Sequence, residues 1–211
     1  MLNIASWANI AHQDVHLDVS PALSAWGPGL AYSRLLRFKS GSDVELPSLA
    51  VECDLCESWE MESPISFLFN LRDDVRWQSI APVNGRALVA DDVVFSYIRQ
   101  GNPALPNSPL LHNVAEVGAI GELGLRVTAR SQDADFLTSL ADGHSKIVAR
   151  EAVDTAGDLR NGPTIGTGPW ILKRTEQDDV HEFALNLEYF ESALPLLDGL
   201  RVHILPDEQT R

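Results

Sequence analysis

Short stretches in which apolar and polar residues alternate are the feature that most restricts the fold of this chain. Successive side chains point to opposite faces of a β-strand, so this alternation predicts a strand with one buried face. The pattern recurs in five segments, residues 2–8, 65–72, 124–130, 180–187 and 199–205. In the fourth segment, Leu187 is expected on the same buried face as Phe183.

Helical spacing is found at two places between these strands. Residues 87–100 place Val94, Tyr97 and Ile98 at positions i, i+3 and i+4, which predicts the buried stripe of a helix. Residues 131–143 predict a second, shorter helix that ends at a glycine. Because strands and helices are intermixed without a regular β-α-β rhythm, the chain is expected to be a mixed α+β or mixed-sheet α/β protein.

The charge balance excludes several classes of partner. The 211 residues include 30 Asp and Glu against 16 Lys and Arg, a formal net charge of −14. A surface this acidic repels phosphate groups, so we expect neither nucleic-acid binding nor docking on anionic lipid. No apolar run approaches the length of a transmembrane helix, and no signal peptide is visible at the start. We therefore expect either a cytoplasmic protein or a mature protein whose leader was removed.

The two cysteines, Cys53 and Cys56, form a C-x-x-C pair that permits three interpretations. A redox pair requires a thioredoxin-like strand and helix, and a zinc site requires further Cys or His ligands nearby. Neither feature is evident, so the third interpretation, a local disulfide or two free thiols in a loop, is favoured. A bond that encloses two residues would add little stability.

Residue patterns with catalytic potential are few. His12, Asp14 and His16 form H-x-D-x-H, which on one strand would place three possible metal ligands on one face. The alternative is a solvated polar segment. Phosphate-loop, dinucleotide-binding, serine-hydrolase and zinc-protease motifs are missing from the sequence. Solvated turns or helix starts explain the three Asp-Asp pairs, at residues 73–74, 91–92 and 178–179.

A series of segments, in order along nearly the whole chain, is more specific than any single motif. They are LNIASWANIAHQDVH (2–16), YSRLLRF (32–38), PSLAVECDLCESWEM (47–61), FLFNLRDDVRW (67–77), GRALVADDVVFSY (85–97), GTGPWILK (166–173), NLEYF (186–190) and PLLDGL (195–200). Together they resemble the family 5 extracellular solute-binding proteins, which are the oligopeptide-, dipeptide- and nickel-type binding components of ABC importers.

The sequence departs from the family's pattern at several positions. Val89 stands where a helix-opening threonine is usual, so the side-chain cap of that helix is lost. Leu185 replaces the arginine that commonly precedes Asn186, and the LRDD turn lacks its usual glycine. These departures change local detail and leave the resemblance intact.

The resemblance implies the first lobe of a periplasmic-binding-protein-like two-lobe fold, a mixed sheet with an inserted α+β subdomain. Residues 1–40 and 163–211 are expected to form the sheet-based subdomain, and residues 41–162 the inserted subdomain. Stretches rich in Gly and Pro, near residues 39–48 and 159–170, agree with these boundaries. Because family members are about twice as long, with two lobes, the second lobe is expected to be absent from this chain.

The resemblance also implies a binding protein without catalysis or cofactor. It would capture a peptide or similar solute in the periplasm or outside the cell and deliver it to ABC permease subunits. Membrane attachment is expected only through a lipid anchor outside this chain. The position before YSRLLRF assigns Ser24, Ala25 and Trp26 to the ligand-binding loop, with a hydrophobic plug as the alternative role of Trp26. For one lobe alone, millimolar or weaker affinity is expected.

Two other functions stay open at this point. One is a small metal-dependent hydrolase that uses His12, Asp14, His16 and an acidic pair, which elemental analysis for metal would identify. The other is a protein-interaction lobe without a ligand, which a fluorescence titration with peptides would test.

Overall fold

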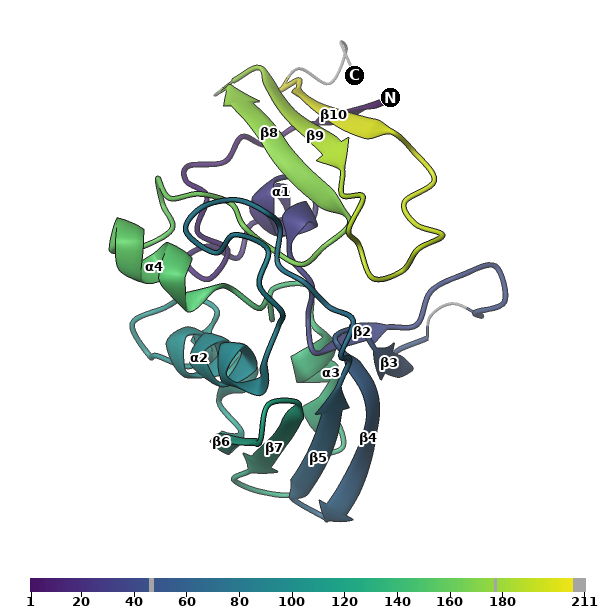
Figure 1. Ribbon diagram of the computed structural model, residues 1–211, viewed down its shortest axis with the longest axis vertical. Helices are drawn as coiled ribbons and strands as arrows, with labels where there is room; N and C mark the ends of the chain where they lie inside the picture. The colour runs from purple at the N-terminus through teal and green to yellow at the C-terminus, as the bar shows by residue number, and fades with distance from the viewer. Residues whose placement is uncertain (46–47, 177, 207–211) are drawn as a thin grey trace.

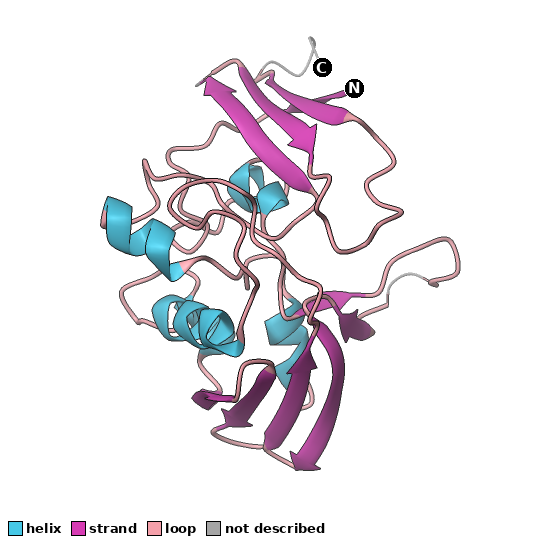
Figure 2. Ribbon diagram, in the orientation of Figure 1, coloured by secondary structure: helices cyan, strands magenta, loops and turns pink. Residues whose placement is uncertain are grey.

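The computed structural model describes residues 1–45, 48–176 and 178–206. Two four-stranded sheets lie at opposite ends of the molecule, with helices and long loops between them (Figures 1 and 2), and β2 and β3 form a separate antiparallel pair. In chain order the elements are β1 (Leu2–Ser6), α1 (Pro21–Ser24), the 3₁₀ helix η1 (Pro28–Ala31), β2 (Leu36–Phe38), β3 (Val51–Cys53), β4 (Cys56–Ser63), β5 (Ser66–Leu71), α2 (Ala90–Gln100), the 3₁₀ helix η2 (Ser108–Leu111), β6 (Val114–Ile120), β7 (Gly124–Ala129), α3 (Phe136–Ala141), α4 (Arg150–Ala156), β8 (Trp170–Glu176), β9 (Val180–Leu185) and β10 (Gly199–Ile204).

The two ends of the described chain build a four-stranded mixed sheet in the order β1-β10-β9-β8. β1 runs parallel to β10 and pairs Ile4 with Val202, whereas β9 is antiparallel to both of its neighbours. A parallel pair needs a crossover connection, and here nearly the whole chain lies between the two strands. The predicted mixed sheet from the chain ends is confirmed.

Burial in this sheet follows the predicted alternation in β10 but not to the end of β9. Val202 and Phe183 are fully buried and pack in one cluster under the sheet. The expectation that Leu187 shares this face is wrong, because its side chain is 88% exposed. Asn186 ends the strand: its side-chain amide donates to the carbonyl oxygen of Gly168 at 2.9 Å, and the chain turns away.

The second sheet is fully antiparallel, in the order β4-β5-β7-β6. Its inner strands are the two predicted ones, and Phe69 and Leu125 are fully buried. The edge strands β4 and β6 are not predicted by the sequence. In β4, residues 57–62 are all exposed, so the strand carries no alternation of burial that an apolar pattern could reveal.

Helix α2 is confirmed, but its buried face is rotated from the predicted one. Val93 and Tyr97 are buried, whereas Ile98 is 64% exposed. Ser96 is also buried, and its hydroxyl donates to the carbonyl oxygen of Val148 at 3.1 Å and accepts from that residue's N–H at 2.9 Å. Apolar spacing missed this face because part of it consists of polar side chains with partners. In the region expected to be a helix over 131–143, only α3 is helical.

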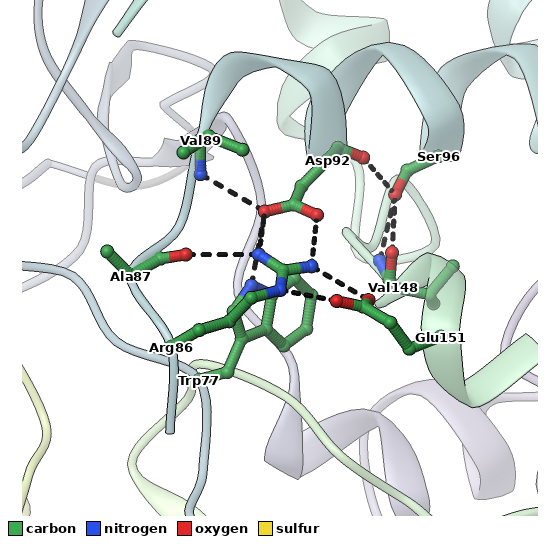
Figure 3. A network of polar contacts seen from close by, with 8 residues as sticks. All are labelled: Trp77, Arg86, Ala87, Val89, Asp92, Ser96, Val148 and Glu151. Atoms are coloured by element: carbon green, nitrogen blue, oxygen red, sulfur yellow. Dashed lines mark hydrogen bonds and ion pairs between the residues drawn. The ribbon is translucent and has the colours of Figure 1, made fainter. Parts of the chain in front are cut away.

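A network of charged groups joins α2 to α4 (Figure 3). The Arg86 guanidinium donates to both carboxylate oxygens of Asp92, at 2.8 and 2.7 Å, and to Glu151 at 2.8 Å. Asp92 also accepts from the indole N–H of Trp77 at 3.2 Å and from the backbone N–H of Val89 at 3.1 Å. Segment 85–97 therefore links α2 to α4, and both carboxylate oxygens of Asp92 accept hydrogen bonds.

This network corrects one expectation and explains another. Asp92 is only 4% exposed, so it is not part of a solvated helix start, although its neighbour Asp91 is exposed as expected. Val89 makes no side-chain cap at the start of α2, as its identity predicts. The carboxylate of Asp92, three residues later, accepts a hydrogen bond from the Val89 backbone N–H. This is the half of a capping box that does not depend on the side chain at position 89.

One large hydrophobic cluster occupies the middle of the molecule. It joins residues 10–36 to side chains between residues 55 and 165, and Trp77 is fully buried in it. The division into residues 1–40 with 163–211 and residues 41–162 stays a prediction. None of the helices in the described part of the chain has the length and apolar character needed to cross a bilayer.

Candidate functional site

The H-x-D-x-H segment contributes to the fold, and its three side chains have separate partners. Asp14 is fully buried and pairs with the Arg99 guanidinium, Nη1 to Oδ1 at 3.0 Å. The His12 ring accepts the N–H of Asp14 at 3.2 Å. The His16 Nε2–H donates to the carbonyl oxygen of Lys146 at 2.9 Å. Burial, with the nearby Arg99 charge, lowers the pKa of His16 to about 4, so the ring is neutral at pH 7.

These contacts remove the basis of the hydrolase alternative. The segment is not a strand, so the three residues do not share a face. Across residues 1–45, 48–176 and 178–206, no group of three His, Cys, Asp or Glu side chains is placed to hold a metal ion.

Cys53 and Cys56 form a disulfide, the local pairing among the interpretations of the sequence. Their Cα atoms lie 5.0 Å apart and close the turn between β3 and β4. The two enclosed residues are buried: Leu55 packs in the core, and the Asp54 carboxylate accepts the backbone N–H of Arg34 at 2.9 Å. The disulfide therefore fixes the turn that presents Asp54.

The glycines of GTGPW let two distant segments of the chain touch. The backbone N–H of Gly168 donates to the carbonyl oxygen of Ala31 at 2.9 Å. A Cβ atom on Gly166 would lie 1.9 Å from that same oxygen, so no larger residue fits this contact. This close contact brings Trp170, the first residue of β8, to the same pocket as Tyr32.

Four of the segments that carry the family resemblance, 32–38, 47–61, 166–173 and 186–190, meet at one pocket of about 210 Å³. The first, third and fourth of these contribute Tyr32, Ser33, Arg34, Pro169, Trp170 and Tyr189 to its wall. The disulfide-closed turn adds Asp54, and the loop before α4 adds Lys146. Aromatic rings, backbone groups and charged side chains therefore converge in one concave place, which is typical of a small-molecule site.

The charges at this pocket are unevenly paired. Arg37 is well neutralised: its guanidinium lies 2.8 Å from Glu52, 2.7 Å from Glu191 and 3.6 Å from Asp54. Arg34 lies 3.9 Å from Asp54 through its Nε atom, a loose ion pair without a hydrogen bond.

Lys146 is the least compensated charge at the pocket. Its side chain is 7% exposed, and its Nζ atom makes one long contact, 3.5 Å to the carbonyl oxygen of Tyr32. Within the described residues, no carboxylate lies within 4.0 Å of it. Burial, together with the positive charge of Arg34, lowers the pKa of Lys146 to about 7. Burial also raises the pKa of Asp54. Groups of this kind in a cleft mark candidate functional sites.

The loop predicted to bind ligand precedes the wall of this pocket by a few residues in the sequence. Ser24 is buried at the end of α1, whereas Ala25 and Trp26 are exposed, Trp26 by 42%. The pocket wall begins a few residues later, at Gly29 and Leu30. The exposure of Trp26 favours the open-loop role over a hydrophobic plug, and ligand contact by these three residues stays a prediction.

Sequence reasoning missed the charged wall of the pocket. Arg34 lies inside a recognised segment but carries no pattern of its own. Asp54 is hidden between the cysteines, and Lys146 stands alone before the buried residues 147–149. A lone lysine beside an apolar run was the only available signal, and it does not identify a partner.

The comparisons with known proteins agree with the fold and the segments. The family model described as "Bacterial extracellular solute-binding proteins, family 5 Middle" matches residues 50–211. The chain belongs to this family of solute-binding proteins.

Individual relatives show the same relationship. A probable di/tripeptide-binding protein 5 of Pseudomonas aeruginosa is 32% identical over 200 residues, covering 85% of this chain and 36% of that protein. Heme-binding protein A of Haemophilus influenzae is 31% identical over 226 residues, covering 92% of this chain and 39% of that protein. The solved structure of MoaA from A. tumefaciens R10, in complex with mannopinic acid, superposes with a TM-score of 0.85 at 25% identity, covering 100% of this chain and 42% of that one.

The fold is thus the α/β fold of periplasmic binding proteins. The chain spans a little over a third of the length of the curated relatives it matches.

Proposed function

We propose that the protein captures a small peptide, or a similar solute, outside the cytoplasm and delivers it to the permease of an ABC importer. The pocket beside Tyr32, Lys146 and Trp170 is the part of the solute site that this chain supplies. The Ser24–Trp26 loop forms its outer wall. Attachment to the membrane is through a lipid anchor outside the 211 residues, and binding involves no covalent chemistry.

The convergence at the pocket is the observation that carries this proposal. Segments 32–38 and 47–61 are far in the sequence from segments 166–173 and 186–190, and the two groups meet where the least compensated charges lie. A binding family places its polar and aromatic groups around the solute, whereas groups needed only for folding are found paired, as Asp92 is.

The dimensions and chemistry of the pocket favour a peptide over a bulkier solute. Its volume, about 210 Å³, is below the ~300–1,000 Å³ usual for complete small-molecule sites. It therefore suits one end of an extended solute whose remainder contacts other parts of the receptor. The charged side chains of its wall can bind the charged ends of a short peptide, the kind of ligand named for the di/tripeptide-binding relative.

Binding of peptides to the full-length protein tests the proposal. Isothermal titration with di- to pentapeptides is expected to give saturable heat with micromolar dissociation constants. Indole fluorescence should change on binding, because Trp170 lines the pocket and Trp26 is exposed in the loop that we assign to its outer wall.

Matched single substitutions then locate the site. Trp170→Phe and Trp26→Phe should each remove part of the fluorescence change, whereas Trp7→Phe, on an exposed residue outside the pocket wall, should not. Absence of saturable binding for every peptide would exclude peptide capture. If peptides bind but the fluorescence change is the same in Trp170→Phe, Trp26→Phe and the wild type, the solute site lies elsewhere.

A further inference from the structure

The starting point is the balance of charge and hydrogen bonds inside the pocket. Its wall carries three cations, Arg34, Arg37 and Lys146, and one buried acid, Asp54. Two other carboxylates hold Arg37 at hydrogen-bonding distance. This leaves Asp54 as the counter-charge within the pocket wall for both remaining cations. Asp142 also faces them from outside the wall, and it pairs with His144 at 2.8 Å.

Asp54 is largely occupied. One of its oxygens accepts the backbone N–H of Arg34 at 2.9 Å, and the other lies 3.6 Å from the Arg37 guanidinium. Arg34 reaches Asp54 only at 3.9 Å, and its Nε–H, although buried, has no acceptor among the described residues. Lys146 is outside ion-pair distance altogether in this part of the structure.

Unused donors therefore remain at two side chains of the pocket. An ammonium group has three N–H donors, and Lys146 uses one of them at the long distance of 3.5 Å. The Arg34 guanidinium has five donors, and its Nη1 makes one long contact, 3.4 Å to the carbonyl oxygen of Ala141. A buried cation with unmet donors is unfavourable unless a partner arrives.

We propose that Lys146 and Arg34 form a carboxylate subsite, which binds the acidic end of the solute. This inference rests on the proposed function and specifies which end of the solute enters the pocket. A carboxylate is acceptor-only and carries the missing negative charge, so it satisfies donors that Asp54 leaves free. A positively charged end is disfavoured, because it would add a third uncompensated cation.

A two-by-two titration tests the subsite in the full-length protein. The ligands are a peptide that binds in the survey above and the same peptide with an amidated C-terminus. The proteins are the wild type and Lys146→Met, which removes the charge and keeps an unbranched chain. In the wild type, amidation is expected to weaken binding at least tenfold. In Lys146→Met, acid and amide should bind within about threefold of each other.

Lys39→Met provides the matched control. The chain holds three lysines, and Lys39 is exposed and outside the pocket wall. This variant loses the same charge and should keep the full preference for the acid. An unchanged preference in Lys146→Met would overturn the subsite and leave peptide capture standing. Absence of any peptide binding in the wild type would instead overturn the proposed function.

A second measurement needs no variant, so it holds even where Lys146→Met does not fold. In the full-length protein labelled with ¹⁵N-lysine, the Lys146 Nζ resonance is identified by its pKa of about 7 without peptide and is followed against pH. The peptide acid should raise the pKa of the Lys146 ammonium by one unit or more, and the amide should not. An equal effect of acid and amide, or no effect of either, would contradict the subsite.

Discussion

Two groups of buried charges in this molecule differ in how completely they are paired. Around Asp92, both carboxylate oxygens have donors, and the Arg86 guanidinium is divided between Asp92 and Glu151 (Figure 3). Around Lys146, the ammonium has one long contact with a carbonyl oxygen. The first group joins two helices, and the second lines a pocket.

The difference is the basis on which we distinguish charges that stabilise the fold from charges that we propose bind a ligand. A buried carboxylate is tolerated when hydrogen bonds compensate its lost hydration, and Asp92 meets that condition within the chain. Lys146 does not, so the folded protein holds it in an unfavourable state. Under the carboxylate subsite that we propose, the solute relieves this imbalance.

The largest expected effect is on the free energy of unfolding when the paired group is broken. Asp92→Ala leaves the Trp77 indole and the Val89 N–H without their acceptor and should destabilise by about 3 kcal/mol. We place the value at the low end because Arg86 is 32% exposed and water can replace part of its contacts. Denaturant unfolding measures it.

Two controls sharpen this result. Asp91→Ala, at the exposed neighbouring position, should change stability by less than about 0.5 kcal/mol. Lys146→Met should be within about 1 kcal/mol of wild type or more stable, since an apolar isostere replaces an unpaired charge. A loss from Lys146→Met as large as that from Asp92→Ala would mean that Lys146 is a structural charge.

The change in stability at acid pH tests a third buried group, His16, whose ring donates to the carbonyl oxygen of Lys146. Its pKa in the folded protein, about 4, is below the ordinary 6.5, so the unfolded chain takes up the proton first as the pH falls. The stabilisation is present above pH 6.5 and is lost between about pH 6.5 and 4, by about 3 kcal/mol.

His16→Gln is expected to flatten that part of the stability curve, because glutamine keeps an N–H for the Lys146 carbonyl but does not titrate. His112→Gln, at an exposed position, should leave the curve unchanged. Denaturant unfolding at a series of pH values measures both. Equal curves for wild type and His16→Gln would show that His16 does not carry the acid sensitivity.

The pH dependence of solute binding is expected to be smaller. Lys146 faces Arg34, Asp54 and Asp142, and its pKa is about 7 in the free protein. Affinity for a peptide acid should be constant below about pH 7 and fall by at most about tenfold per unit above it, as the free protein loses the proton that the complex retains. Titration calorimetry from pH 6 to 9 measures this slope. A slope that persists in Lys146→Met would assign the pH dependence to another group.

The smallest effect is expected at the disulfide. Its bond encloses two residues, so it restricts the unfolded chain little, and Cys53→Ser should cost about 1 kcal/mol. Framework disulfides typically contribute ~2–5 kcal/mol. Thermal unfolding with and without reductant measures the difference. Failure of Cys53→Ser to fold would show that the turn around Asp54 supports far more of the structure than the pocket wall.

Elements with a strong local signal could be predicted from the sequence. β5, β7 and β10 alternate cleanly, and α2 has helical spacing, so each was found. Strand β4 was not predicted, because both of its faces are exposed at the sheet edge. Only its hydrogen bonds to β5 define it as a strand. The buried face of α2 was misplaced because Asp92 and Ser96 are polar residues with buried partners.

The sequence pointed to residues near the candidate site but did not identify the charged residues that line it. The segment order indicated the family and pointed to Ser24–Trp26, which lie a few residues from the pocket wall. Lys146 and Asp54 are 92 positions apart in the sequence, and neither has a motif. They are brought to one pocket by Arg34, whose backbone forms a β-bridge with Lys146 and donates to the Asp54 carboxylate.

By itself, the sequence determined the family, the class of fold and the strands with one apolar face, because these depend on residue order and local periodicity. Only the tertiary structure decided which charges are paired. Asp92 and Lys146 are both ionisable residues next to apolar runs, and nothing in the sequence distinguishes them. Pairing depends on distances of about 3 Å, and packing sets these between groups far apart in the chain. It brings Glu151 to 2.8 Å from Arg86, whereas the nearest partner it gives the Lys146 ammonium is the carbonyl oxygen of Tyr32, at 3.5 Å.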